Sequence, residues 1–190
     1  MRRILLALVA AVLLAACNQG GQEQGTGAAA AAPNDADVTF TQNMIPHHQQ
    51  AIEMAKLVDS HTKRPQLRTL ADAIAASQGQ EITLMQGWLR TWGKPSTPEG
   101  MDHGAMQMPG MMSEADMRQL RLSNDEDFDV LFLDMMTAHH EGAILMADTE
   151  LRDGALAEVK GLAQQIIDAQ QGEIGQFTRW QQDWKSTPIR

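Results

Sequence analysis

One segment of the chain occurs twice. Residues 43–55 read NMIPHHQQAIEMA and residues 135–147 read MMTAHHEGAILMA, so each position lies 92 residues after its counterpart. The correspondence continues without a gap from Asp37 and Asp129 to Trp92 and Trp184. A match of this length indicates a duplicated unit that cannot bury its apolar face alone and packs against its copy.

In both copies, apolar residues recur at steps of three and four, the period of an amphipathic helix. This period predicts helices over 35–58, 65–93, 125–151 and 156–185, and Ser113 with Asp116 predicts the cap of a short helix that ends near Leu122. No stretch alternates with period two, so no sheet is expected. We therefore predict an all-α fold, a four-helix bundle of two tandem hairpins. The hairpins would span 35–93 and 125–190, joined by a connection over 94–124 within one domain, 35–190.

The N-terminus is typical of an exported lipoprotein. Arg2 and Arg3 precede an apolar run that is too short to span a bilayer. The run ends in Leu-Ala-Ala-Cys at positions 14–17, which resembles the lipobox of bacterial lipoproteins. We expect a signal peptide over 1–16, a lipid on Cys17, and a flexible tether that completes 17–34.

A lipidated Cys17 implies a protein of the cell envelope, anchored to a membrane and facing the periplasm. Asn18 after the cysteine would favour the outer membrane in a Gram-negative host. The alternative is an ordinary signal peptide followed by a free thiol. Cys17 is the only cysteine, so in either case the exported chain has no intramolecular disulfide.

The chain is acidic. Its formal charge is −9, and removal of Arg2 and Arg3 with the signal makes it −11. Such a charge argues against nucleic acid and anionic lipid surfaces as partners, and it is compatible with the collection of cations.

Six polar residues fall on the inward faces of the predicted helices: His47, His48, Glu81, His139, His140 and Glu173. Buried carboxylates need partners, and the histidine doublets are the nearest supply. Two interpretations remain open. The residues form a structural hydrogen-bond network, or they form a metal site in the bundle core.

The residue three before each first histidine is a methionine. Met44 precedes His47 and Met136 precedes His139, giving Met-x-x-His where di-iron bundles have Glu-x-x-His. Thioether with imidazole suits Cu(I), or Ag(I) as its mimic, better than iron. The alternative is that both methionines only fill the core.

The predicted connection contains a second set of soft donors. Residues 101–112 read MDHGAMQMPGMM, a segment with thioethers but no leucine, isoleucine or valine. Such a tract favours Cu(I) and Ag(I). The alternative is a mobile apolar flap over the bundle. The candidate ligands are Met101, His103, Met106, Met108, Met111 and Met112.

The segments MIPHHQQAIEMA and MMTAHHEGAILMA, with EITLMQGWLRTWG at the end of the second predicted helix, resemble the domain of unknown function 305 family from about Asp37 to Lys185. The resemblance implies a ferritin-like helical bundle. It also implies copper handling, because some members, of the CopM type, are exported copper-binding proteins. It extends to the doublets and their methionines, whereas the glutamates rest on periodicity alone.

These observations favour a non-enzymatic, membrane-anchored protein that binds Cu(I), or Cu(II) as a second choice, with silver as a mimic. It would act as a buffer or chaperone in copper homeostasis or resistance, and a copper-handling protein would be its partner. One alternative is a ferritin-like metalloenzyme that uses the histidines and carboxylates. The other is a structural envelope protein with a buried His/Glu network.

Overall fold

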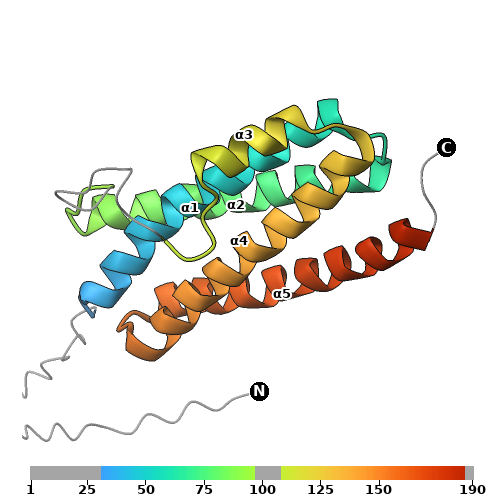
Figure 1. The fold of residues 1–190 in the computed structure, drawn as a ribbon. Helices are drawn as coiled ribbons and strands as arrows, with labels where there is room; N and C mark the ends of the chain where they lie inside the picture. Colours follow the sequence, from blue (N-terminus) through green and yellow to red (C-terminus); the bar gives the residue numbers. More distant parts are fainter. Residues whose placement is uncertain (1–30, 97–107, 187–190) are drawn as a thin grey trace, which may run out of the picture. The chain divides into compact units, whose positions relative to one another are not determined.

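The computed structural model describes residues 31–96 and 108–186. These residues form helices and loops and contain no strand (Figure 1). The predicted all-α class is confirmed. The helices are α1 (Asp35–His61), α2 (Pro65–Thr91), α3 (Glu114–Leu122), α4 (Asp125–Asp153) and α5 (Ala157–Ser186). The predicted signal peptide, Cys17, most of the tether, and Met101, His103 and Met106 lie outside the described residues.

Local sequence signals explain where three of the helices begin. Asn34 caps α1 and Ser113 caps α3, each in a reciprocal capping box with the aspartate three residues later. Pro65 stands at the first position of α2, where its missing N–H is not needed. Pro46 lies inside α1, yet the helix continues through it from Asp35 to His61.

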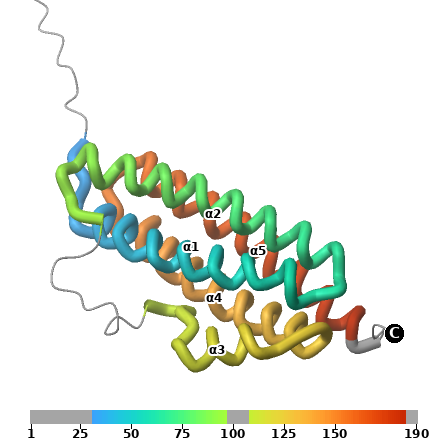
Figure 2. Tube along the Cα trace, turned by 90° about the horizontal axis from the view of Figure 1, so that it is seen from above, coloured from blue at the N-terminus to red at the C-terminus, as the bar shows by residue number. Residues whose placement is uncertain are grey.

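The helices pack in sequence-adjacent pairs, α1 with α2 and α4 with α5, and the pairs meet mainly through α1 and α4. These two helices run antiparallel. The His61 ring at the end of α1 stacks on Phe128 near the start of α4, while Asn34 before α1 donates to the Asp153 carbonyl at the end of α4. In Figure 2, α3 lies along α1 and α4 on the side away from α2.

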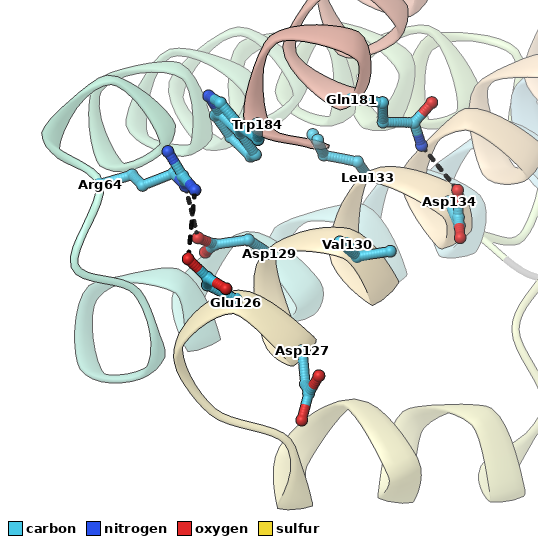
Figure 3. Close-up of a pocket in the computed structure, with 9 residues that line it drawn as sticks. All are labelled: Arg64, Glu126, Asp127, Asp129, Val130, Leu133, Asp134, Gln181 and Trp184. Carbon is cyan, nitrogen blue, oxygen red and sulfur yellow. Dashed lines mark hydrogen bonds and ion pairs between the residues drawn. The ribbon is translucent and has the colours of Figure 1, made fainter. Parts of the chain in front are cut away.

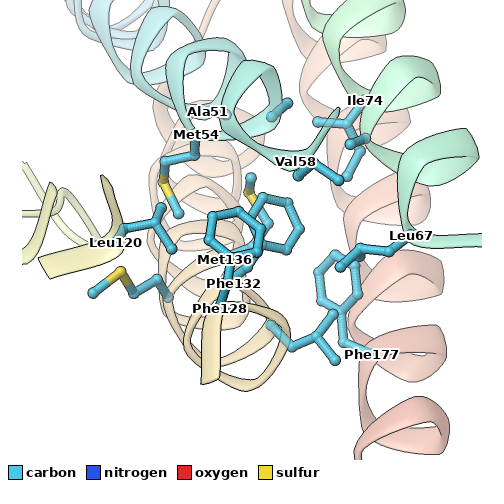
Figure 4. Packing of buried hydrophobic residues seen from close by; sticks show 14 of the residues in the cluster. Ala51, Met54, Val58, Leu67, Ile74, Leu120, Phe128, Phe132, Met136 and Phe177 are labelled. Atoms are coloured by element: carbon cyan, nitrogen blue, oxygen red, sulfur yellow. The ribbon is translucent and has the colours of Figure 1, made fainter. Parts of the chain in front are cut away.

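The apolar core divides into two clusters. One gathers residues from all five helices, including Met136, the phenylalanines of α4 and Phe177 (Figure 4). The other contains Met44 of α1 together with Ala143 and Ala147 of α4. The two methionines that correspond in the repeat therefore lie in different clusters. Buried histidines are found along the contact between α1 and α4.

None of the helices in the described part of the chain is long and apolar enough to cross a membrane.

Candidate metal centre

Equivalent histidines of the two copies meet in the core. The rings of His47 and His139 have centroids 3.8 Å apart and planes inclined by 40°. Both side chains are completely buried. Antiparallel packing of α1 on α4 brings corresponding positions together at only one point, and this point is the histidine pair. The duplication therefore places the local pseudo-twofold axis at these imidazoles.

The second histidine of each doublet is bonded to the glutamate of its own helix pair. His48 Nε2 lies 2.6 Å from Glu81 Oε2, and His140 Nε2 lies 2.5 Å from Glu173 Oε2. Both imidazoles are fully buried, whereas the glutamate side chains keep 17% and 22% of their surface exposed. Because a carboxylate accepts, each Nε2 carries the proton and each Nδ1 is left without one when the ring is neutral.

The paired rings of His47 and His139 are held in the neutral form. Burial lowers the pKa of His47 to about 3, with a further contribution from nearby His48. Burial also lowers the pKa of His139 far below its usual value, and the neighbouring His47 adds to this. Neutral imidazoles keep the lone pair that a metal ion requires.

The doublets contain five buried ring nitrogens without a hydrogen-bond partner: Nδ1 of His47, His48 and His140, and both nitrogens of His139. The main chain of His47 lies near the His139 ring and favours its protonation slightly, but no hydrogen bond of regular geometry results. Most buried polar groups in proteins have partners, and an unpartnered one costs about 1–3 kcal/mol. Five such atoms in one place point to a ligand-binding centre.

The structure places Met44 and Met136 one helical turn before the doublets, both completely buried. Among the described residues, no three His, Cys, Asp or Glu side chains are grouped closely enough to hold an ion. A metal ion in this core would therefore bind through fewer than three of those side chains, through thioethers, or through both. Low coordination numbers and thioether ligands fit Cu(I) and Ag(I).

The end of the predicted Met/His-rich tract lies on this centre. We call residues 108–112 the strap. His47 Nε2 donates to the Pro109 carbonyl at 3.0 Å. The side chains of Met108, Met111 and Met112 are half-buried, and Met112 packs against the first core cluster.

Three residues that form or contact the strap were not predicted from the sequence: Gln50, Pro109 and Gly142. Gln50 bonds both main-chain groups of Met112, and a Cβ on Gly142 would lie 2.0 Å from the Pro109 carbonyl oxygen. A signal was present, because positions 50 and 142 correspond in the repeat but carry Gln and Gly. A glycine inside a helix also suggests a close approach of other backbone.

A cavity of about 360 Å³ lies away from the histidines (Figure 3). Its wall includes Arg64, Asp129 and Trp184, and the Arg64 guanidinium lies 4.1 Å from the Trp184 ring centroid. Arg64 also donates to Asp129 at 2.9 Å, so these two charged side chains already have each other as partners. The cavity contains none of the predicted site residues.

Fold and site thus define a helical protein with a duplicated, buried imidazole centre. The chain belongs to the DUF305 family: residues 37–181 match the family model described as domain of unknown function. Residues 1–18 match the prokaryotic membrane lipoprotein lipid attachment site.

Solved structures of similar chains agree with this membership. A DUF305 fragment from Deinococcus radiodurans is 33% identical, with a TM-score of 0.71 over 78% of this chain and 96% of that one. The protein CopM in its Cu(I)-bound form is 31% identical, with a TM-score of 0.65 over 78% and 96%. CopM has also been solved in Cu(II)-bound, Ag-bound and apo forms. An uncharacterised protein of Acanthamoeba polyphaga mimivirus is 42% identical over 53 residues, 28% of this chain and 35% of that protein.

Proposed function

We propose that this protein binds Cu(I), and Ag(I) as its mimic, outside the cytoplasm, as a buffer or chaperone in copper homeostasis or resistance. The core ligands are Met44, His47, His48, Met136, His139 and His140. The tract with Met101, His103, Met106, Met108, Met111 and Met112 is the capture loop. A lipid on Cys17 anchors the chain in the cell envelope, and a copper-handling protein receives the metal.

One observation carries the proposal: five buried ring nitrogens have no partner, in a core where burial keeps His47 and His139 neutral. A purely structural network would have been expected to satisfy these atoms. A soft cation would be a partner for the unprotonated nitrogens among them, since an unprotonated imidazole nitrogen is a good ligand for it.

In this proposal, Glu81 and Glu173 fix the orientation of the His48 and His140 rings. A metal-bound histidine commonly donates its other N–H to a carboxylate or a carbonyl, which fixes the ring and raises its basicity. His48 and His140 have such a partner in the two glutamates, and His47 has one in the Pro109 carbonyl. In this proposal Glu81 and Glu173 therefore orient the histidine ligands and do not bind the ion themselves.

Related proteins support this proposal. CopM, of similar sequence and fold, is described in Cu(I)-, Cu(II)- and Ag-bound forms. The lipid attachment match at residues 1–18 supports export and anchoring through Cys17. We also assign the helices to the ferritin-like four-helix class, on the packing of α1 with α2 and of α4 with α5.

Thioether participation can be tested by replacing Met44 and Met136 together with leucine. Met and Leu have similar volumes, so the core should lose less than about 1.5 kcal/mol of stability at each site. We expect the affinity for Cu(I) and Ag(I), measured against a colorimetric chelator, to fall about tenfold or more, a loss of about 1.4 kcal/mol or more. All proteins carry Cys17→Ser to remove a competing thiol.

The matched control is Met54→Leu. Met54 is equally buried on α1 but lies outside the Met-x-x-His pairs. It should keep the affinity of the parent protein. Equal affinity in the double variant and the parent would assign Met44 and Met136 to packing alone.

The capture loop is tested separately with its five methionines, Met101, Met106, Met108, Met111 and Met112, replaced by leucine. Helical content by circular dichroism should be retained, and the number of Cu(I) ions bound should fall. Unchanged stoichiometry would remove the loop from the binding site. If the parent protein itself takes up no Cu(I) or Ag(I), the histidines form a structural network instead.

A further inference from the structure

The strap is bonded to the helix that carries the first doublet. Gln50 lies on α1, three residues after His47. Its amide accepts from the Met112 N–H at 2.7 Å and donates to the Met112 carbonyl at 2.8 Å. One side chain thus satisfies both main-chain groups of a strap residue, as a neighbouring β-strand would.

Two glycines allow the strap to approach α4. Gly110 has φ +77°, in the left-handed region that favours glycine, and a Cβ there would lie 2.5 Å from the Ala138 carbonyl oxygen. A Cβ on Gly142 would lie 2.0 Å from the Pro109 carbonyl oxygen. Both clashes involve backbone, so neither can be relieved by rotating a side chain. The strap lies on α4 only because both positions lack a side chain.

With the strap against α4, the Pro109 carbonyl lies within hydrogen-bond distance of the His47 ring. The carbonyl can only accept, so the His47 ring holds its proton on Nε2 and leaves Nδ1 as the free lone pair. The His139 ring has no hydrogen bond to the strap, and neither of its nitrogens makes a hydrogen bond of regular geometry. Positions 50 and 142 correspond in the repeat. Gln50 makes hydrogen bonds to the strap, whereas Gly142 leaves room for it. The connection therefore distinguishes two otherwise equivalent histidines.

We propose that the strap is a positioning element for His47: held by Gln50 and seated against Gly142, it sets the tautomer in which His47 Nδ1 is presented to a soft metal ion. This inference rests on the proposed Cu(I) and Ag(I) binding. It makes the metal affinity of the first doublet depend on two residues that do not bind the ion.

The test uses Gly142→Ala in the full chain carrying Cys17→Ser. The added methyl group must displace Pro109 from α4 and so break its bond to His47, while alanine favours the helix more than glycine does. Gly172→Ala is the matched control, because a Cβ at this position on α5 meets nothing within 4 Å. Gln50→Ala displaces the strap by a second route, without a clash.

Two readouts are needed. In metal-free protein, long-range ¹H–¹⁵N spectra of the imidazoles should show His47 as the Nε2–H tautomer in the parent and in Gly172→Ala. Gly142→Ala and Gln50→Ala should show a mixture of tautomers. Ag(I) affinity should then fall about 10–100-fold in these two variants, as when other second-sphere groups are removed.

A His47 ring that remains a single Nε2–H tautomer in both variants would overturn the inference, and so would unchanged Ag(I) affinity. If the tautomer changes as expected but the parent protein binds no Ag(I), the metal-binding function fails while the effect of the strap on His47 stands. The metal-free spectra therefore separate the two claims.

Discussion

At the scale of single residues, the doublet histidines differ in what holds them. His48 and His140 bond carboxylates at the margin of the core, His47 bonds a carbonyl, and His139 bonds nothing of regular geometry. Three of the four rings therefore have their Nε2 engaged and their Nδ1 free. An oriented ring with one free nitrogen is arranged as in many histidine metal sites.

The glutamates should influence affinity without binding metal. Glu81→Gln and Glu173→Gln keep a hydrogen-bond acceptor near His48 and His140 but remove the negative charge. We expect each substitution to lower Ag(I) affinity by about 10–100-fold and to leave helical content unchanged. Isothermal titration of each single variant checks this. A variant that binds as tightly as the parent would show that the carboxylate has no role in the site.

At the scale of the helices, α1 is joined to the loop between α4 and α5 by the Asp37 carboxylate. Asp37 accepts from the main-chain N–H of Leu156 at 2.9 Å, and Glu150 lies beside it. Burial, with the Asp37 carboxylate next to it, raises the pKa of Glu150 to about 8. Burial also acts on Asp37, but N–H groups including those of Leu156 and Asn34 outweigh it and lower the pKa of Asp37. Glu150 is therefore protonated at neutral pH.

This pair makes stability depend on pH. A folded-state pKa raised from 4.5 to about 8 means that the contribution of protonated Glu150 is complete below pH 4.5 and is lost as pH rises through about 8. Between pH 7 and 9 the melting temperature should therefore fall. Each kcal/mol lost corresponds to about 2–4 °C for a chain of this size.

Glu150→Gln removes the titrating group while keeping its size. Its melting temperature should be nearly constant from pH 7 to pH 9, and at pH 9 it should exceed that of the parent. Thermal unfolding followed by circular dichroism measures both. A parallel decline in parent and variant would mean that another group causes the dependence.

At the scale of the whole described domain, aspartates of one helix pair reach the loop of the other. Asp37 of α1 binds the loop before α5, and its counterpart Asp129 of α4 accepts from Arg64 in the loop before α2. The two ends differ, because Arg64 corresponds to Leu156 in the repeat. One end is therefore joined by an ion pair and the other by main-chain hydrogen bonds.

Removal of the Arg64 guanidinium should be costly. Arg64→Met keeps the apolar stem but leaves Asp129, which is 1% exposed, as a buried carboxylate without its cationic partner. The free energy of unfolding should fall by about 3–5 kcal/mol. Lys63→Met is the control, since the neighbouring Lys63–Asp125 pair is exposed to solvent and should contribute little to stability. Urea unfolding of both variants measures the two losses of stability. Similar losses in Arg64→Met and Lys63→Met would contradict a stabilising role of the Arg64–Asp129 ion pair.

Much of this architecture is predictable from sequence. The apolar period and the caps at Asn34 and Ser113 predict the helices, and the repeat predicts that the doublets and glutamates share one arrangement. The meeting of His47 with His139 was not predictable, because it depends on the antiparallel register of α1 on α4. For the strap, Gly142 inside a helix was a signal that other backbone approaches there, but the contacts themselves depend on the path of an irregular connection that has no counterpart in the repeat.

The most direct test of the central claim is a Cu(I) competition titration of the core without the loop thioethers. The parent carries Cys17→Ser and leucine at the five loop methionines. The variant also has glutamine at His47, His48, His139 and His140, which allows the bonds to Glu81 and Glu173 to persist. We predict that the parent withdraws Cu(I) from the chelator and that the folded variant does not. Equal withdrawal by both proteins, or none by either, would contradict a soft-metal centre at the histidine doublets.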